Sequence, residues 1–266
     1  MSRPTAQTTA HPEAPEAVIA VGDRFEEFHA NRGTVPVSDL LARLRSGDVP
    51  EGLAVSVGQG LSDEQLAEIR TLADRHAPAV TVAKPGVPER AQQRLTHKHD
   101  AKNVLIGPVG QIGENRFAAD LVLDERVEVL EDHLTGQHIP AITLLEAARQ
   151  FWTVVTEQFY VTGPDRTRFV IGSVGSTFHS FVFPLAATLQ YELLELTRTP
   201  VGPVFRCRIS IHHGDTLATV IEAEYRVIPE RFSVKQEKIA ARQAVASELT
   251  RLRDQAAPAM SGGRAA

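Results

Sequence analysis

The residues best suited to chemistry lie in one stretch of the sequence, from Glu131 to Phe159. Its first half is polar and carries two histidines, His133 and His138, and Glu146 follows in the second half. Carboxylates and neutral imidazoles are common general bases and acids near neutral pH. We therefore predict Glu146, His138 and His133 as catalytic residues whose chemistry is proton transfer.

The second half of this stretch predicts a long helix that begins near Pro140, where a missing N–H and a fixed φ cost little. Apolar residues cover most of its circumference: Ile142, Leu144, Leu145, Ala147, Ala148, Phe151, Trp152, Val154, Val155 and Phe159. A narrow polar stripe remains at helical spacing: Glu146, Arg149, Gln150, Thr153 and Glu157. A helix this apolar is buried, so other elements must wrap around it.

Two interpretations of the polar stripe stay open. It could be a solvated seam in which Glu146 pairs with Arg149 one turn along the helix. Alternatively, Glu146 and the loop histidines could converge on one site, which the Gly-containing loop ahead of the helix favours. Arg149 is then either a partner of Glu146 or a bidentate ligand of a substrate phosphate. His138 could instead pack the loop, and His133 could lie on the surface.

Length and composition exclude several classes of protein. A chain of 266 residues with a net charge of -5 suits one large domain or a domain with an appendage, and argues against a dedicated nucleic-acid binder. No apolar run is long enough to span a membrane, and the N-terminus lacks the pattern of a secretory signal. The single cysteine, Cys207, and the scattered histidines predict no metal site. We expect a cytoplasmic protein.

The first third of the chain predicts a disordered tail over residues 1–17 and an α/β extension over residues 18–90. Residues 37–46 read as a helix capped by Ser38 or Asp39. Two short strands, 53–57 and 79–83, flank a helix that Ser62 opens with a capping box to Gln65. The turn Gly58-Gln59-Gly60 lacks the spacing of a dinucleotide fingerprint, so we interpret the extension as a docking or regulatory unit.

From residue 91 to 232 the sequence alternates β-rich segments and turns around the single long helix. The expected strands cover residues 104–109, 116–123, 168–174, 177–183, 188–197, 204–212 and 216–228, with a hairpin tip at residues 213–215. A charged helix follows within residues 233–255, and a disordered tail covers residues 256–266. A curved antiparallel sheet that wraps one helix is an α+β fold of the hotdog kind.

The run from Asp132 to Gln150, D-H-L-T-G-Q-H-I-P-A-I-T-L-L-E-A-A-R-Q, resembles the A-factor biosynthesis hotdog family. That family acts in making γ-butyrolactone signals and related natural products in actinomycetes. The matching signature comprises His138, Pro140, Glu146, Ala147, Arg149 and Gln150, and the resemblance covers roughly residues 94–230. His97-Lys98 and residues 104–106 also look like the opening strand of that family. More distantly, the chain is similar to hotdog hydroxyacyl-carrier-protein dehydratases, which pair a loop histidine with a helix glutamate.

The resemblance implies an acyl or β-ketoacyl thioester substrate, carried on CoA or on the phosphopantetheine of a carrier protein, with no other cofactor. The expected reaction is acyl transfer to a small hydroxylated acceptor such as a glycerone phosphate. Arg149, Gln150, Gly172 and Ser173 are the expected substrate-binding residues, the glycine allowing a β-bulge or close approach of the thioester arm. A dehydratase or thioesterase, and a non-catalytic hotdog that binds an acyl carrier, remain alternatives. Members commonly contain two hotdog repeats, so a single repeat implies a homodimer.

Overall fold

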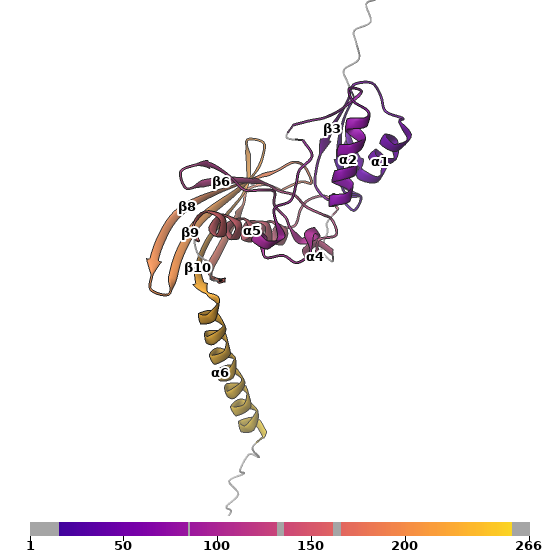
Figure 1. The fold of residues 1–266 in the computed structure, drawn as a ribbon. Helices are drawn as coiled ribbons and strands as arrows, with labels where there is room; N and C mark the ends of the chain where they lie inside the picture. The colour runs from indigo at the N-terminus through magenta and orange to yellow at the C-terminus, as the bar shows by residue number, and fades with distance from the viewer. Residues whose placement is uncertain (1–15, 85, 132–135, 162–165, 257–266) are drawn as a thin grey trace, which may run out of the picture.

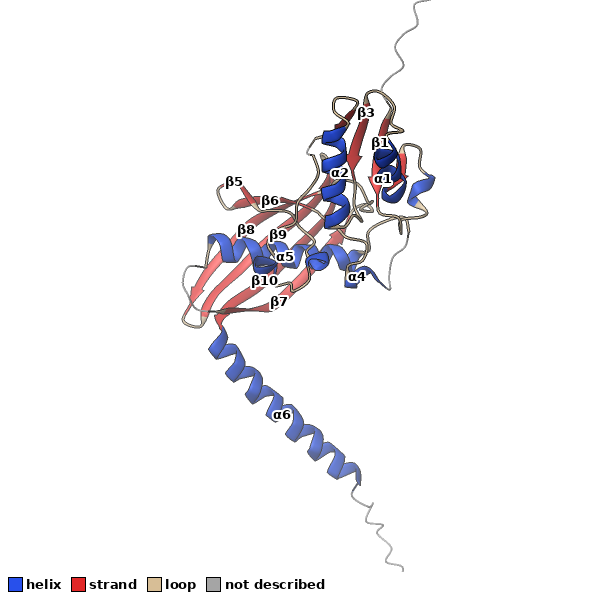
Figure 2. Cartoon of the chain, turned by 45° about the vertical axis from the view of Figure 1, so that its right-hand side comes forward, coloured by secondary structure: helices blue, strands red, loops and turns tan. Residues whose placement is uncertain are grey.

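The computed structural model describes residues 16–84, 86–131, 136–161 and 166–256. A six-stranded antiparallel sheet holds a long helix against one face, and a smaller parallel sheet with two helices packs at one end (Figures 1 and 2). A C-terminal helix projects from the opposite end of the molecule (Figure 2). Most of the two predicted tails, residues 1–15 and 257–266, lies outside the described residues. At their inner ends the prediction of disorder is wrong, because Ala17 begins a strand and Ala256 ends the C-terminal helix.

The six-stranded sheet confirms the predicted α+β hotdog arrangement. Its strand order is β5-β6-β8-β9-β10-β7, and each neighbouring pair is antiparallel. The strands are β5 (Gly110–Gly113), β6 (Arg116–Asp120), β7 (Thr167–Phe178), β8 (Thr188–Thr199), β9 (Gly202–His213) and β10 (Thr216–Pro229). The long helix α5 (Ala141–Phe159) begins after Pro140, as predicted, and lies across the sheet.

Aromatic side chains fill the space between α5 and the sheet. The Trp152 ring stacks on Tyr225 at 5.5 Å, and Tyr225 stacks on Phe205 at 5.3 Å. The hydroxyls of Tyr225 and Thr156 share a hydrogen bond of 2.7 Å, so the polar end of the buried tyrosine is satisfied. Cys207 is buried in the same core, and burial raises the pKa of its thiol to about 12.

The N-terminal unit is a four-stranded parallel sheet, with order β2-β1-β3-β4. Its strands are β1 (Ala17–Val21), β2 (Thr34–Pro36), β3 (Leu53–Val57) and β4 (Val80–Val82), and its helices are α1 (Val37–Ser46) and α2 (Asp63–Arg75). Apolar residues of both helices and the strands form a second core, which includes Leu44, Val55 and Ile69. We call residues 16–84 the parallel-sheet unit.

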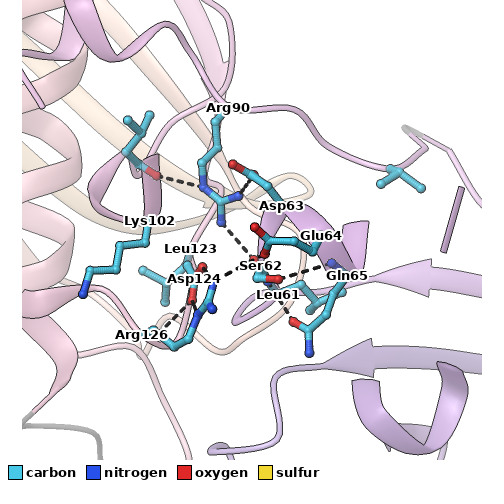
Figure 3. Close-up of polar contacts among 12 residues, drawn as sticks. Leu61, Ser62, Asp63, Glu64, Gln65, Arg90, Lys102, Leu123, Asp124 and Arg126 are labelled. Atoms are coloured by element: carbon cyan, nitrogen blue, oxygen red, sulfur yellow. Dashed lines mark hydrogen bonds and ion pairs between the residues drawn. The ribbon is translucent and has the colours of Figure 1, made fainter. Parts of the chain in front are cut away.

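Short elements connect these parts: η1 (Phe28–Ala30), α3 (Gln93–Thr96), η2 (Ala101–Asn103) and α4 (Glu128–Glu131). At the junction of the two sheets, Arg90 contacts Asp63 and donates a hydrogen bond of 2.9 Å to the Leu61 carbonyl (Figure 3). Arg126 makes a bidentate pair with the buried Asp124 and holds the pKa of that carboxyl below its usual range, although burial opposes the shift. Each of these two ion pairs therefore joins one buried charge, Arg90 or Asp124, to a half-exposed partner, Asp63 or Arg126.

Several local predictions are confirmed. Helix α1 has the predicted bounds and ends at Gly47 in the left-handed conformation, and the capping box between Ser62 and Gln65 is present. The hairpin of β9 and β10 turns at Gly214, as expected.

Other local predictions are wrong. Pro36, not Ser38 or Asp39, precedes α1, and the Asp23 side chain instead accepts the Ser38 N–H. Residues 104–109 form only an isolated bridge, Ile106 to Leu121. The two strands expected over 168–183 are one strand, β7, because Gly175 and Ser176 pair with β10 without a break and the strand ends at Phe178. Strands β1 and β2 were not predicted.

The C-terminal helix α6 (Glu230–Ala256) follows β10 directly, and residues 235–255 are exposed on all sides. Among the described helices, none combines the length and apolar character needed to cross a membrane.

Candidate functional site

A pocket of about 490 Å³ opens between α5, β7 and the segment that contains α3 and η2. One end of the pocket is polar and holds Lys98, Glu146 and Arg149. The other walls are mainly apolar and comprise Val127, Val129, Ile142, Leu145, Trp152, Ile171 and Val174, with Asn103 and Glu128 as further polar lining residues. We call this space the Glu146 pocket. Its shape and lining suit an apolar chain attached to a polar or anionic group.

The Glu146 carboxylate is bound from three sides. Arg149 donates from Nε to Oε2 (2.8 Å) and from Nη2 to Oε1 (2.9 Å), a bidentate pair. Lys98 Nζ lies 2.6 Å from Oε1, and Gln150 Nε2 donates to the same oxygen at 3.1 Å. Burial alone would raise the pKa of Glu146, but the hydrogen bonds and charges of Arg149, Lys98 and Gln150 outweigh it and lower the pKa to about 2.

The polar stripe of α5 is not a solvated seam, which corrects one of the two interpretations. Residues 93–105 lie along it and supply a partner to each of its charged residues. Arg149 also donates to the Thr96 carbonyl (3.2 Å), and the Glu157 carboxylate lies 2.7 Å from His97 Nε2. Gln150 is fully buried and exchanges hydrogen bonds with Asn103 O and Leu105 N, both 2.8 Å. The predicted substrate residue Gln150 thus fastens this segment to the helix.

His138 does not line the Glu146 pocket. It lies in a second pocket of about 320 Å³ with Phe178, His179, Ser180 and Phe181, and its ring contacts Phe181 at 4.7 Å. We call this the His138 pocket. The first turn of α5 separates the two spaces, since Ala141 lines one and Ile142 the other. His133 lies outside the described residues. Within the described chain, the expected convergence of Glu146 and a loop histidine is therefore not found in one pocket.

Strand β7 forms the outer wall of the Glu146 pocket. Its register with β10 shifts at Gly172, which is the predicted β-bulge. Gly172 lies against Glu224 of the neighbouring strand β10 and does not line the Glu146 pocket. Ser173 is exposed and does not line it either. The bulge brings Ile171 and Val174 into the pocket instead. Substrate binding by Gly172 and Ser173 stays a prediction.

Sequence reasoning missed Lys98 as a site residue. The sequence relates His97-Lys98 only to the family pattern, because the position of Lys98 beside Glu146 depends on the path of residues 93–105 across the helix. Asn103 and the wall residues Ile171 and Val174 were missed for the same reason. A periodicity argument cannot place residues from separate elements in one pocket.

A family model described as the A-factor biosynthesis hotdog domain matches residues 80–223, just over half of the chain. A search of curated protein sequences found no significant match. Among solved structures, a mutant thioesterase from Pseudomonas aeruginosa is 13% identical, covering 55% of this chain and 97% of its own, with a TM-score of 0.40. A thioesterase from Haemophilus influenzae is 16% identical over 47% of this chain and 78% of its own, with a TM-score of 0.35. At these scores the likenesses carry no information about the reaction.

Proposed function

Because this chain belongs to the A-factor biosynthesis hotdog family, we propose that it binds an acyl thioester in the Glu146 pocket and transfers the acyl group to a small hydroxylated acceptor. The observation that carries the proposal is the pairing of an apolar wall with a charged end in one pocket. An acyl chain matches the first feature, and a polar acceptor matches the second.

The charged end favours an acceptor that carries an anionic group. Lys98 and Arg149 bring two positive charges, and Glu146 supplies one negative charge within 3 Å of both. A phosphate or carboxylate at this end would meet a guanidinium and an ammonium that Glu146 already holds in place. Glu146 therefore has a second role, which is to orient the two cations.

In the proposed reaction the acceptor hydroxyl oxygen attacks the thioester carbonyl carbon. A C–O ester bond forms, the C–S bond breaks, and the hydroxyl proton ends on the departing thiol. Glu146 is the candidate proton carrier, and backbone N–H groups in the first turn of α5 are candidate donors to the oxyanion. A carboxyl with a pKa of about 2 is a weak base. We propose that an anionic acceptor draws Lys98 and Arg149 partly away from Glu146 and so raises that pKa.

A specific observation favours a second candidate function. Both oxygens of Glu146 are already hydrogen-bonded and its pKa is low, which suits a structural anchor as well as a base. A non-catalytic protein that binds an acyl group, carried on CoA or a carrier protein, would need the Glu146 pocket but no general base.

We also propose a homodimer formed through the hotdog sheet. Strand β7 is the last strand of the sheet, and its free edge carries exposed Val170, Ile171, Val174 and Phe178. Unpaired strand edges with apolar residues tend to pair with another strand. A second copy at this edge would lie next to both pockets, since Ile171 lines one and Phe178 the other.

The test is thiol release from octanoyl-CoA and 3-oxooctanoyl-CoA, with and without dihydroxyacetone phosphate. Acyl transfer predicts release that depends on the acceptor, together with an ester product seen by mass spectrometry. Release without acceptor would identify a thioesterase, and loss of water from a 3-hydroxyacyl-CoA would identify a dehydratase. Saturable binding with no turnover of any of these would favour the non-catalytic function, and absence of binding would refute both.

A further inference from the structure

We propose that the parallel-sheet unit is a positioning element for the segment that leads into α5. This segment comprises residues 121–131 and 136–139, and we call it the lead-in segment. It contributes to both pockets: Val127, Glu128 and Val129 line the Glu146 pocket, and His138 and Ile139 line the His138 pocket. The parallel-sheet unit holds it at two separate places.

The first attachment is made by Gln59, which is almost fully buried. Its Nε2 donates to the Leu121 carbonyl (2.9 Å) and the Leu185 carbonyl (3.2 Å), and its Oε1 accepts the Leu123 N–H (2.8 Å). The neighbouring Gly60 donates its N–H to the Leu123 carbonyl at 2.9 Å. One side chain therefore joins the start of the lead-in segment to the loop before β8. A buried amide with all these partners fixes one local geometry.

The second attachment is made by η1. The Phe28 N–H donates to the Gly136 carbonyl at 3.0 Å, close to the other end of the lead-in segment. The Phe28 ring stacks on Phe183 at 5.8 Å, and Phe183 contacts Phe181, the ring against which His138 packs. Phe28 belongs to the core of the hotdog sheet and not to the core of its own unit.

The contact between the two parts leaves no room for a ligand at the carboxyl ends of β1 and β3. Ligands of open α/β sheets commonly bind at that edge. Here a Cβ on Gly58 would lie 2.4 Å from the Pro184 carbonyl oxygen, and one on Gly22 would lie 2.3 Å from Glu125 Oε2. Residues of the hotdog part occupy the carboxyl ends of β1 and β3. The unit therefore uses this edge to hold the lead-in segment and not to bind a ligand.

The test uses the full chain, because removing the unit would take the side chains of Val21, Phe25 and Phe28 out of the hotdog core and leave their neighbours exposed. Gln59→Ala loosens the first attachment and Phe28→Ala the second, while Phe28→Leu keeps an apolar side chain there. Leu44→Ala is the matched control, since Leu44 is fully buried in α1 and packs only within the second core. Circular dichroism and melting of each variant report whether it is folded.

Amide hydrogen exchange at Leu130 and Ile139 is the main measurement. Neither amide bonds to a mutated side chain: Leu130 donates to Val127 O and Ile139 donates to Val182 O. We expect exchange at both amides to accelerate by about tenfold or more in Gln59→Ala and Phe28→Ala, less in Phe28→Leu, and not in Leu44→Ala. Wild-type exchange in both attachment variants, or equal acceleration in Leu44→Ala, would overturn the inference.

A second measurement rests on the proposed function. Calorimetric titration with octanoyl-CoA should give about tenfold weaker binding in the two attachment variants and unchanged binding in Leu44→Ala. If the wild-type protein does not bind octanoyl-CoA, the proposed function fails, while the exchange rates still decide whether the unit positions the lead-in segment.

Discussion

Lys98 Nζ lies 2.6 Å from Glu146 Oε1, so a residue from the segment ahead of the hotdog sheet completes the set of partners that Arg149 begins on the helix. The two residues come from different elements, and their pairing joins the wall of the Glu146 pocket to its central helix. This arrangement decides how the site responds to pH, to substitution and to ligands.

Glu146 should make the stability of the fold depend on pH. Its pKa falls from an ordinary 4.5 to about 2 on folding, so the folded state favours the ionised form. The stabilisation, about 3 kcal/mol, is complete above pH 4.5 and is lost as the pH falls toward 2. Urea unfolding should show that the difference in free energy of unfolding between wild type and Glu146→Gln is about 2 kcal/mol smaller at pH 3 than at pH 7.

Glu248→Gln is the control for this pH dependence, because Glu248 pairs with Arg251 on the exposed surface of α6. A gap between wild type and Glu146→Gln that stays constant with pH would contradict the ion-pair account. If Glu146 is also the base, the same variant should lose turnover by roughly two to four orders of magnitude at pH 7.

Arg149→Met and Lys98→Met should separate acceptor binding from thioester binding. Losing a charge-assisted hydrogen bond costs about 1.5 to 3 kcal/mol, so KM for dihydroxyacetone phosphate should rise roughly ten- to a hundredfold. KM for the acyl-CoA should change little. Glycerol, an uncharged acceptor, serves as the comparison. An equal rise in KM for glycerol would show that the cations do not recognise the anionic group.

Ile171→Trp should shorten the acyl chain that the Glu146 pocket accepts. The larger ring enters from the β7 wall, and Trp152 on the far side is held by its stack on Tyr225 and cannot retreat. Excluding three methylenes from the pocket would weaken binding of the longer chain by about 2 kcal/mol. The affinity for decanoyl-CoA should therefore fall roughly thirtyfold relative to the affinity for butanoyl-CoA. Leu194→Trp, an exposed position outside the pocket, is the control. Unchanged chain-length preference would place the acyl group elsewhere.

Light scattering at micromolar concentration should give a mass near twice the 29.0 kDa of the chain, as expected for a homodimer. Val170→Lys places a charge on the exposed edge strand without entering the Glu146 pocket, and lysine at such an edge opposes strand pairing. That variant should scatter as a monomer. A monomeric wild type, or a dimer unaffected by Val170→Lys, would remove β7 as the interface.

The sequence predicts the elements whose signals are local. Helix α5 follows from its long apolar pattern and Pro140, and the β9–β10 hairpin follows from the turn at Gly214. Strands β1 and β2 escape prediction because β2 has only three residues and pairs with β1 in parallel, which requires a crossover and not a tight turn.

In the candidate site, too, only the relationships that are local in sequence can be predicted. Helical spacing alone predicts the pair of Glu146 and Arg149, which are three residues apart. The position of Lys98 depends on how residues 93–105 cross α5, and the separation of His138 from Glu146 depends on which side of the first helical turn each faces. Both are consequences of tertiary packing.

Helix α6 changes how this molecule diffuses. Its 27 residues extend about 40 Å, and beyond its first turn it stands clear of the two sheets (Figures 1 and 2). A rod attached to a globular body increases friction far more than it increases mass. The chain will therefore elute early on a sizing column, where a monomer can imitate a dimer, and it will sediment slowly, as a particle of smaller mass does. Removing residues 235–256 should restore the elution expected of a sphere.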